Sequence, residues 1–334
     1  MILKQKKIYI GIEFLRIFFS FNILLLHCLN KFIYKKQLYK IINVIVSTGL
    51  KIFFIIAFYF SYDLFSSKNI THIKRRFERL LIPYIIWPMI IYIYRINIFY
   101  SFLYTKYYEL KILCYQFLIG HGIANVFWFS YNLIFISLML TIIIFIIKNN
   151  IIFLLISSIP VYLYYISNYY KNFFLNYKEI VVFSNKPLAS TYILGVIGFS
   201  LSYFKMIDKA KKKNFFLIIC CSTFLILFIL YYEKVKKFYF LSYLFSISLI
   251  ALFTDLPFHK LKIENIIKQI SLHTGGIYYI HINIHLLINQ HFISKYHLRR
   301  GTITICIVNY LICYILCFIG FRIFKKNKLK YLFI

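Results

Sequence analysis

Apolar residues run along this chain in long blocks, and short polar segments separate one block from the next. A helix of about 20 apolar residues crosses a hydrocarbon core of about 30 Å, and most of the blocks have that length. The pattern therefore predicts an all-α fold, a polytopic transmembrane helical bundle of about ten spans. The blocks lie at 8–29, 41–66, 80–104, 126–147, 151–166, 188–206, 214–232, 238–254, 269–293 and 302–322.

Composition agrees with this class. The 334 residues are 62% hydrophobic and only 15% charged, which is typical of an integral membrane protein in contact with a lipid bilayer. The formal net charge of +31 would suggest nucleic acid in a soluble protein. Here the basic residues sit mostly between the apolar blocks, so we expect them to flank the membrane and to bind anionic ligands, with no nucleic-acid partner.

One domain is expected to fill the chain. The sequence shows no internal repeat, no Pro/Gly-rich linker and no appended soluble domain, so residues 1–334 are predicted to form a single membrane-embedded domain. Lys4, Lys6 and Lys7 precede a block that is too long for a signal peptide. An even number of spans, with more Lys and Arg on the side of the termini, predicts that both termini lie in the cytoplasm.

The first block carries ionisable residues where a charge is costly. It reads IYIGIEFLRIFFSFNILLLHCL and contains Glu13, Arg16 and His27. An arginine at the centre of a span costs about 2.5–3.5 kcal/mol on insertion scales, so such residues usually have a function. Glu13 and Arg16 can pair as i,i+3 neighbours. Arg16 and His27 lie about 16 Å apart along a helix and within about 20° of one face. The alternative is an arginine that snorkels and a histidine near the far headgroups.

A cluster of arginines precedes the third block. Arg75, Arg76 and Arg79 come just before an apolar run that begins near Leu80, and Pro83 is expected in the first turn of its helix. Guanidinium groups at a cytoplasmic helix entry can bind phosphate groups in a bidentate manner. The same residues also fit ordinary anchoring by positive charge on the cytoplasmic side.

The later blocks add aromatic and histidine positions. Trp128 and its neighbours fit an interfacial aromatic belt. In the ninth block His281 and His285 have an i,i+4 spacing that can bind zinc, but no third acidic ligand is near, so no metal site is predicted. We expect Tyr278 and His281 to face a polar cavity. The cysteines form no CxxC pair and predict no disulfide framework.

In this order, these stretches resemble the acyltransferase-3 family of integral membrane acyltransferases. The first has an acidic residue, a Leu-Arg pair and a histidine eleven residues after the arginine. The second is rich in arginine, the third has a Trp-Phe pair, and the fourth ends in Tyr-x-x-His. They are IEFLRIFFSFNILLLH (12–27), RRFERLLIPYIIW (75–87), VFWFSYNL (126–133) and TGGIYYIH (274–281). The chain departs from the family where Ala57 and Phe58 replace a usual Ser-Gly pair, and where Thr274 and Gly275 replace Ser and Tyr.

The resemblance implies O-acyl transfer, most often of acetyl, from acyl-CoA to a hydroxyl of a cell-surface glycan or its lipid-linked precursor, at the plasma membrane. Acyl-CoA is then a donor substrate, and no bound cofactor is expected. The implied catalytic residues are His27, as base or acyl carrier, with Arg16 and Glu13. The implied donor-binding residues are Arg75, Arg76 and Arg79, and the implied cavity residues are Trp128, Tyr278 and His281.

Two other membrane functions fit the same chemistry. A transporter or flippase of lipid-linked sugars also uses intramembrane Arg and His, without covalent chemistry. A membrane glycan polymerase is the third possibility. A transporter commonly shows broken helices in two matching halves, and this sequence has no such symmetry.

If the first helix enters the membrane at Ile8, His27 lies about 28 Å along it, near the outer edge of the hydrocarbon core.

Overall fold

The computed structural model describes residues 10–28, 36–98, 127–147, 186–203, 239–254, 263–288 and 303–334, together with a few single residues between these ranges. For some positions inside the helices only the backbone is described, and His27 is one of them. Every described element is a helix, and no strand occurs among these residues. The predicted all-α fold is therefore confirmed.

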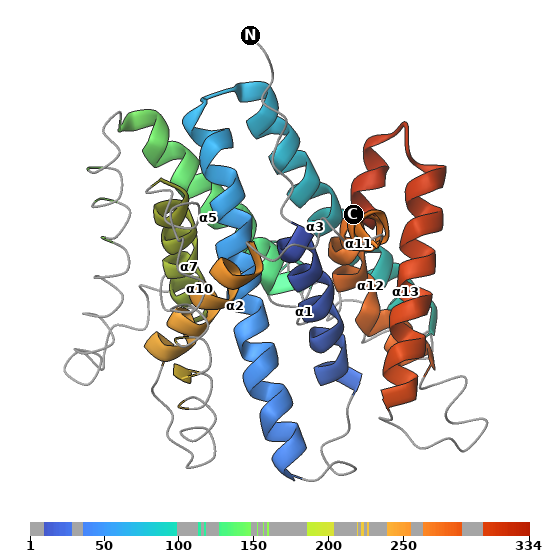
Figure 1. Cartoon of the computed structure of the whole chain (residues 1–334). Coiled ribbons are helices and arrows are strands. Elements are labelled where there is room, and N and C mark those ends of the chain that lie inside the picture. The colour runs from blue at the N-terminus through green and yellow to red at the C-terminus, as the bar shows by residue number, and fades with distance from the viewer. Residues whose placement is uncertain are drawn as a thin grey trace, which may run out of the picture. The chain divides into compact units, whose positions relative to one another are not determined.

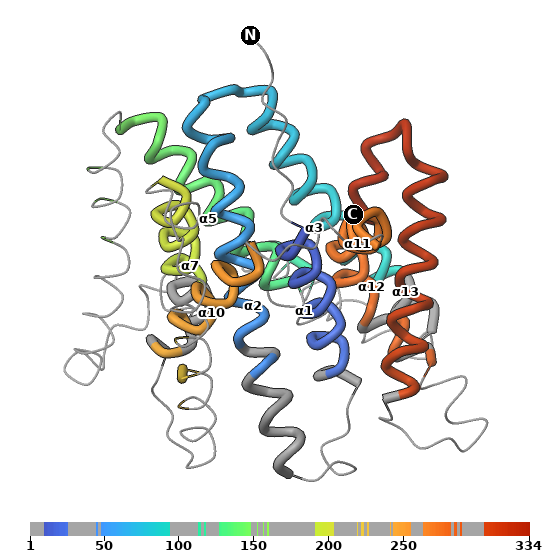
Figure 2. Tube along the Cα trace, in the orientation of Figure 1, coloured from blue at the N-terminus to red at the C-terminus, as the bar shows by residue number. Residues whose placement is uncertain are grey.

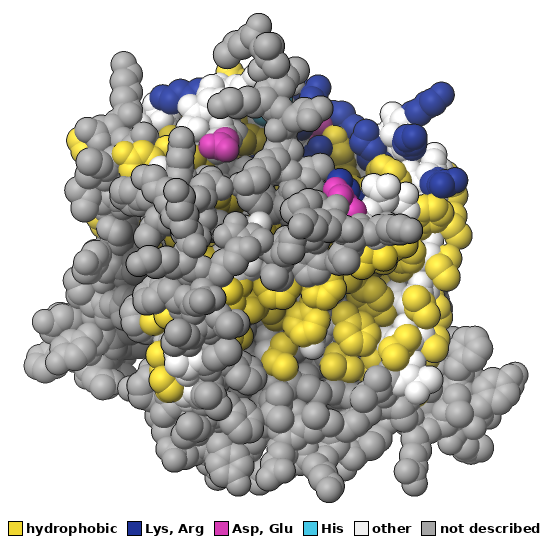
Figure 3. All heavy atoms as spheres, viewed as in Figure 1, with side chains coloured by type: hydrophobic (Ala, Val, Ile, Leu, Met, Phe, Trp, Pro, Cys, Tyr) yellow, Lys and Arg dark blue, Asp and Glu magenta, His cyan; other side chains and the backbone are white. Residues whose placement is uncertain are grey.

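Most described helices follow the predicted apolar blocks to within a few residues. Within the described part of the chain, three stretches are long and apolar enough to cross a bilayer: Thr48–Ser66, Phe127–Ile146 and Thr304–Ile323. Figure 3 shows hydrophobic side chains over much of the described surface that faces the viewer. The total of about ten spans stays a prediction, because the fifth and seventh blocks lie mostly outside the described residues. The helices that match blocks are α1 (Ile10–Cys28), α2 (Lys36–Ser66), α5 (Phe127–Ile146), α7 (Lys186–Tyr203), α10 (Tyr239–Thr254) and α13 (Ile303–Ile323).

The third helix begins earlier than its apolar block. α3 spans Ile70–Ile98, so the arginine cluster lies inside the helix and does not precede it. Asn69 caps its start, because the backbone N–H of His72 donates to Asn69 Oδ1 at 3.2 Å. Pro83 lies in the helix interior and not in the first turn, so that prediction is wrong. The reason is that a polar, arginine-rich sequence can be helical without being apolar.

The ninth block is also not one helix. It forms α11 (Glu264–Leu272) and α12 (Thr274–Leu287), which meet at His273. The N–H of His273 donates to the carbonyl of Ile270 at 3.1 Å, and the N–H of Ile277 donates to that of His273 at 3.0 Å. Glycine is a poor helix former, and two glycines follow directly in the sequence Thr-Gly-Gly. Apolar periodicity alone does not reveal such a junction.

The chain divides into two compact units, residues 1–53 with 207–334 and residues 54–206. In the first unit α1 packs against α10, α11, α12 and α13 (Figure 1). The hydroxyl groups of Ser20 on α1 and Tyr310 on α13 are hydrogen-bonded at 2.9 Å. After α13 a short 3-10 helix, η3 (Lys328–Phe333), packs back against α12 and α13 (Figure 2). This unit therefore surrounds the helix that carries Glu13 and Arg16.

The second unit contains the end of α2 with α3, α5 and α7, in which α5 packs against both α3 and α7. Asn132 on α5 donates to the hydroxyl of Thr191 on α7 at 3.0 Å, and both side chains are buried. The ring of Phe199 on α7 lies 6.1 Å from that of Phe58 and 5.8 Å from that of Phe65, both on α2. Aromatic packing and a buried polar bond thus hold these helices together.

Candidate active site

Glu13 and Arg16 on α1 form the predicted ion pair. Arg16 Nη1 donates to Glu13 Oε2 at 2.9 Å, with the two side chains 33% and 25% exposed. The bond between the two side chains holds the guanidinium in one orientation. The sequence predicted this contact because i,i+3 neighbours on one helix meet whatever the rest of the chain does.

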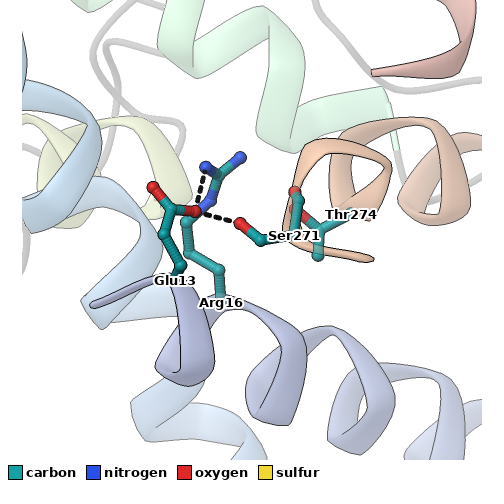
Figure 4. A network of polar contacts seen from close by, with 4 residues as sticks. All are labelled: Glu13, Arg16, Ser271 and Thr274. Atoms are coloured by element: carbon teal, nitrogen blue, oxygen red, sulfur yellow. Dashed lines mark hydrogen bonds and ion pairs between the residues drawn. The ribbon is translucent and has the colours of Figure 1, made fainter. Parts of the chain in front are cut away.

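Ser271 is a third member of this group, and sequence analysis missed it. Its hydroxyl donates to the same oxygen of Glu13, from the last turn of α11 (Figure 4). Thr274 Oγ1 in turn donates to the Ser271 carbonyl at 2.8 Å, and both residues are buried. A serine in an apolar helix is common and usually bonds its own backbone. The available signal was its spacing, which places Ser271 on the face of Thr274 and Tyr278.

Arg16 keeps capacity for a ligand. A guanidinium has five N–H donors. Among the described residues Arg16 donates only to Glu13, and a third of its side chain is exposed. Glu13 accepts two bonds on one oxygen and so stays in place beside the guanidinium. The arrangement can orient an arginine towards an anionic group or a developing oxyanion.

His27 lies on the same helix as this pair. α1 is continuous from Ile10 to Cys28, so the rise of an α-helix puts His27 about 16 Å beyond Arg16 and within about 20° of its face. The side chain of His27 lies outside the described residues. Its role as base or acyl carrier therefore stays a prediction, although the backbone spacing that motivated it is present.

Tyr278 and His281 lie on α12. His281 is 1% exposed, and its Nδ1 lies 2.7 Å from the carbonyl oxygen of Tyr278. A carbonyl can only accept, so Nδ1 donates this bond. Tyr278 packs against a core cluster that includes Leu24 and Leu25 of α1. These contacts bring the predicted tyrosine and histidine to the helix that carries Arg16. A polar cavity beside them stays a prediction.

The arginines of α3 belong to the second unit and divide into two kinds. The guanidinium of Arg76 lies 5.7 Å from the ring of Phe58 and 5.5 Å from that of Phe65. Its Nη2 donates to Ser137 at 3.4 Å, whereas its buried Nε has no hydrogen-bond partner among the described residues. Arg75 and Arg79 are exposed. Arg76 therefore points into the helices, while the other two face outward.

Trp128 also belongs to the second unit. Its ring lies 6.5 Å from that of Phe54 and 6.2 Å from that of Phe129, within aromatic packing at the start of α5. Among the described residues, no group of three or more His, Cys, Asp or Glu side chains is close enough to hold a metal ion.

A separate cavity of about 270 Å³ lies beside α1 in the first unit, between α1, α2 and α10. Its walls are apolar and include Phe14, Phe18 and Phe253. At 100° per residue, Phe14 and Phe18 point to nearly the opposite side of α1 from Arg16. The cavity is thus suited to hydrocarbon and is distinct from the polar group around Glu13.

Comparison with known proteins identifies the family of this chain. No curated protein and no solved structure matches the chain. The sequence model of the family Acyl_transf_3, described as an acyltransferase domain, matches residues 9–322. The match begins at α1 and runs through α13, so it includes every site residue named above. With nearly the whole length covered, this chain is an integral membrane protein that belongs to the acyltransferase-3 family.

Proposed function

We propose that this acyltransferase moves an acyl group, acetyl in preference to longer chains, from acyl-CoA to a hydroxyl of a cell-surface glycan or a lipid-linked glycan precursor. The observation that carries the proposal is the Arg16–Glu13 pair, held by Ser271, on the helix that also bears His27. An arginine kept in one orientation inside a membrane helix suits a site that binds an anionic group of a substrate.

The reaction needs a base, because a hydroxyl is a poor nucleophile at neutral pH. His27 takes the proton of the acceptor hydroxyl while the hydroxyl oxygen attacks the thioester carbonyl carbon. Arg16 lies about 16 Å from His27 along α1, so it holds an anionic part of the donor and presents the thioester to His27 in one orientation. The C–S bond then breaks, and His27 gives its proton to the departing sulfur, so that CoA leaves as the thiol. The acyl group remains on the acceptor as an ester. In the alternative route His27 carries the acyl group transiently.

The donor binds through the arginines of α3 in this proposal. Arg76 supports it, because a buried N–H without a partner costs about 1–3 kcal/mol and a phosphate oxygen would satisfy it. Arg75 and Arg79 are exposed, so their guanidinium groups are assigned to the other phosphate groups of the donor. Acyl-CoA is a substrate, and the chemistry requires no bound cofactor or metal.

The acceptor reaches the site from the extracytoplasmic side of the plasma membrane in this proposal. Both termini of the chain then lie in the cytoplasm. Tyr278 and His281, both on α12, are the residues that we assign to its cavity. This arrangement follows from the depth of His27 along α1, about 28 Å from a cytoplasmic entry at Ile8. Surface glycans then meet His27 from outside while CoA stays in the cytoplasm.

The test uses membranes that contain the protein, labelled acetyl-CoA and a glycan acceptor. We expect label in the glycan with the wild type, and none with His27→Ala at equal abundance and correct insertion. Transfer at the wild-type rate by His27→Ala would reject the catalytic assignment. Movement of lipid-linked saccharide across the membrane without label transfer would favour a flippase, and chain growth without label would favour a polymerase.

A further inference from the structure

The segment that follows α13 turns back onto the first unit. Asn327 begins it, because its side chain accepts the N–H of Leu329 at 3.2 Å and so caps η3. Leu332 is buried at 6% exposure, and the ring of Phe333 stacks on that of Phe324 with centroids 5.8 Å apart. We call residues 327–334 the C-terminal segment. Its buried side chains show that it packs against the first unit.

The first turn of α12 receives this segment at two glycines. A Cβ atom on Gly276 would lie 2.8 Å from the Cα of Phe333, and one on Gly275 would lie 2.5 Å from the backbone oxygen of Ile334. Real Cβ atoms essentially never come so close to another backbone, so the docked position requires glycine at both sites. The backbones of helix and segment are in direct contact here.

His273 completes the docking site. Its Nδ1 lies 2.8 Å from the carbonyl oxygen of Phe333, so the ring donates to the segment. The ring is 2% exposed and packs edge-on against Tyr314 and Phe321 of α13, at 5.7 and 5.5 Å between centroids. This packing leaves the imidazole little room to turn. The bond therefore joins the C-terminal segment firmly to the junction of α11 and α12.

The same junction holds the charged pair of α1. Ser271, which donates to Glu13, is two residues before His273. The Thr274 hydroxyl closes the turn by donating to the Ser271 carbonyl at 2.8 Å. Glu13 and the C-terminal segment thus bind to opposite ends of one tight turn, and a shift of His273 would move Ser271 with it.

We propose that the C-terminal segment is a positioning element for the site. By binding His273, Gly275 and Gly276 it holds the α11–α12 junction in place, keeps Ser271 on Glu13 and so orients Arg16. The effect of this orientation on catalysis rests on the proposed acyl transfer. The mechanical link from segment to ion pair does not, and it can be tested without any substrate.

The first test measures the distance between α1 and the junction. In a chain whose native cysteines are replaced, Glu13→Cys and Ser271→Cys are joined with a short bifunctional thiol reagent. Gly276→Val, which pushes against the segment, and Phe333→Ala, which weakens it, should each lower the cross-linking yield severalfold. Lys326→Ala is the control, because Lys326 is exposed and precedes the segment.

Release of the segment is followed separately by alkylation of Leu332→Cys, a site that is 6% exposed when docked. Alkylation should rise in both undocking variants and stay low in the control. If alkylation rises in the undocking variants but the cross-linking yield is unchanged, the positioning role is wrong. A segment that stays protected in Gly276→Val would overturn the docking geometry itself, since the two backbones leave no space for the side chain.

The second test asks whether the segment acts through Ser271. Phe333→Ala and Ser271→Ala should each lower kcat with little change in the KM for acyl-CoA, and the double variant should be no worse than the poorer single one. Additive losses would contradict the proposed link. A wild type that transfers no acyl group would reject the proposed function, and the cross-linking result would still decide the positioning role.

Discussion

Replacing Ser271 by alanine removes one of the two donors that share Oε2 of Glu13. A hydrogen bond to a charged group contributes about 1.5–3 kcal/mol to stability. Ser271 is 1% exposed, whereas the Glu13 side chain is 25% exposed, so the bond is buried on one side only. We therefore expect the free energy of unfolding to fall by about 1.5 kcal/mol, the lower end of that range.

The same substitution is expected to slow catalysis. Without Ser271 the carboxylate of Glu13 has more freedom, and Arg16 loses part of its fixed orientation. A loss of about 1.4 kcal/mol in transition-state stabilisation lowers kcat about tenfold. The KM for acyl-CoA should change little, because the donor phosphates are assigned to α3. Denaturant unfolding in detergent and initial rates with labelled acetyl-CoA measure the two effects.

Ser20→Ala is the matched control. Ser20 is a buried serine on α1, 5% exposed, and its partner at 2.9 Å is the neutral hydroxyl of Tyr310. A neutral bond contributes about 1 kcal/mol, so this variant should lose some stability and keep its kcat. Equal losses of kcat in the two variants, or an unchanged kcat in Ser271→Ala, would refute the reasoning.

Three further outcomes are expected. Arg75→Gln and Arg79→Gln, both at exposed positions, should raise the KM for acyl-CoA without loss of stability. Arg76→Gln should raise the KM and also lower the free energy of unfolding, because its contact with Ser137 on α5 is lost. An unchanged KM in correctly inserted protein would show that these arginines only anchor the helix at the membrane. Asn69→Ala should lower the unfolding free energy by about 1 kcal/mol through loss of the α3 cap, and no change in the midpoint would contradict the cap. Asn30→Cys, in a background without native cysteines, should react with an impermeant thiol reagent outside intact cells, and labelling only from the cytoplasm would invert the topology.

Local features of the sequence were sufficient for the helices and for one site contact. A bilayer demands about 20 apolar residues per span, so block lengths predicted α1, α5 and α13 to within a few residues. The Arg16–Glu13 bond also followed from the sequence, because its two partners are separated by less than one helical turn.

The start of α3 and the break at His273 were not predictable from the same signal. α3 begins at Ile70 because the arginine-rich stretch is helical although it is not apolar. His273 separates two helices within one apolar block. Hydrophobicity indicates which residues contact lipid, whereas the ends of a helix depend on caps and on side-chain hydrogen bonds. These boundaries therefore had to come from the structure.

Only the tertiary structure could show what holds the ion pair. Ser271 and Glu13 are 258 positions apart, and no local pattern relates them. The contact of Phe333 with His273 crosses 60 positions and depends on two glycines whose missing side chains leave space for a backbone. Such contacts arise because the chain folds α11, α12 and its C-terminal segment around α1, and complementary shape in three dimensions leaves little trace in the order of residues.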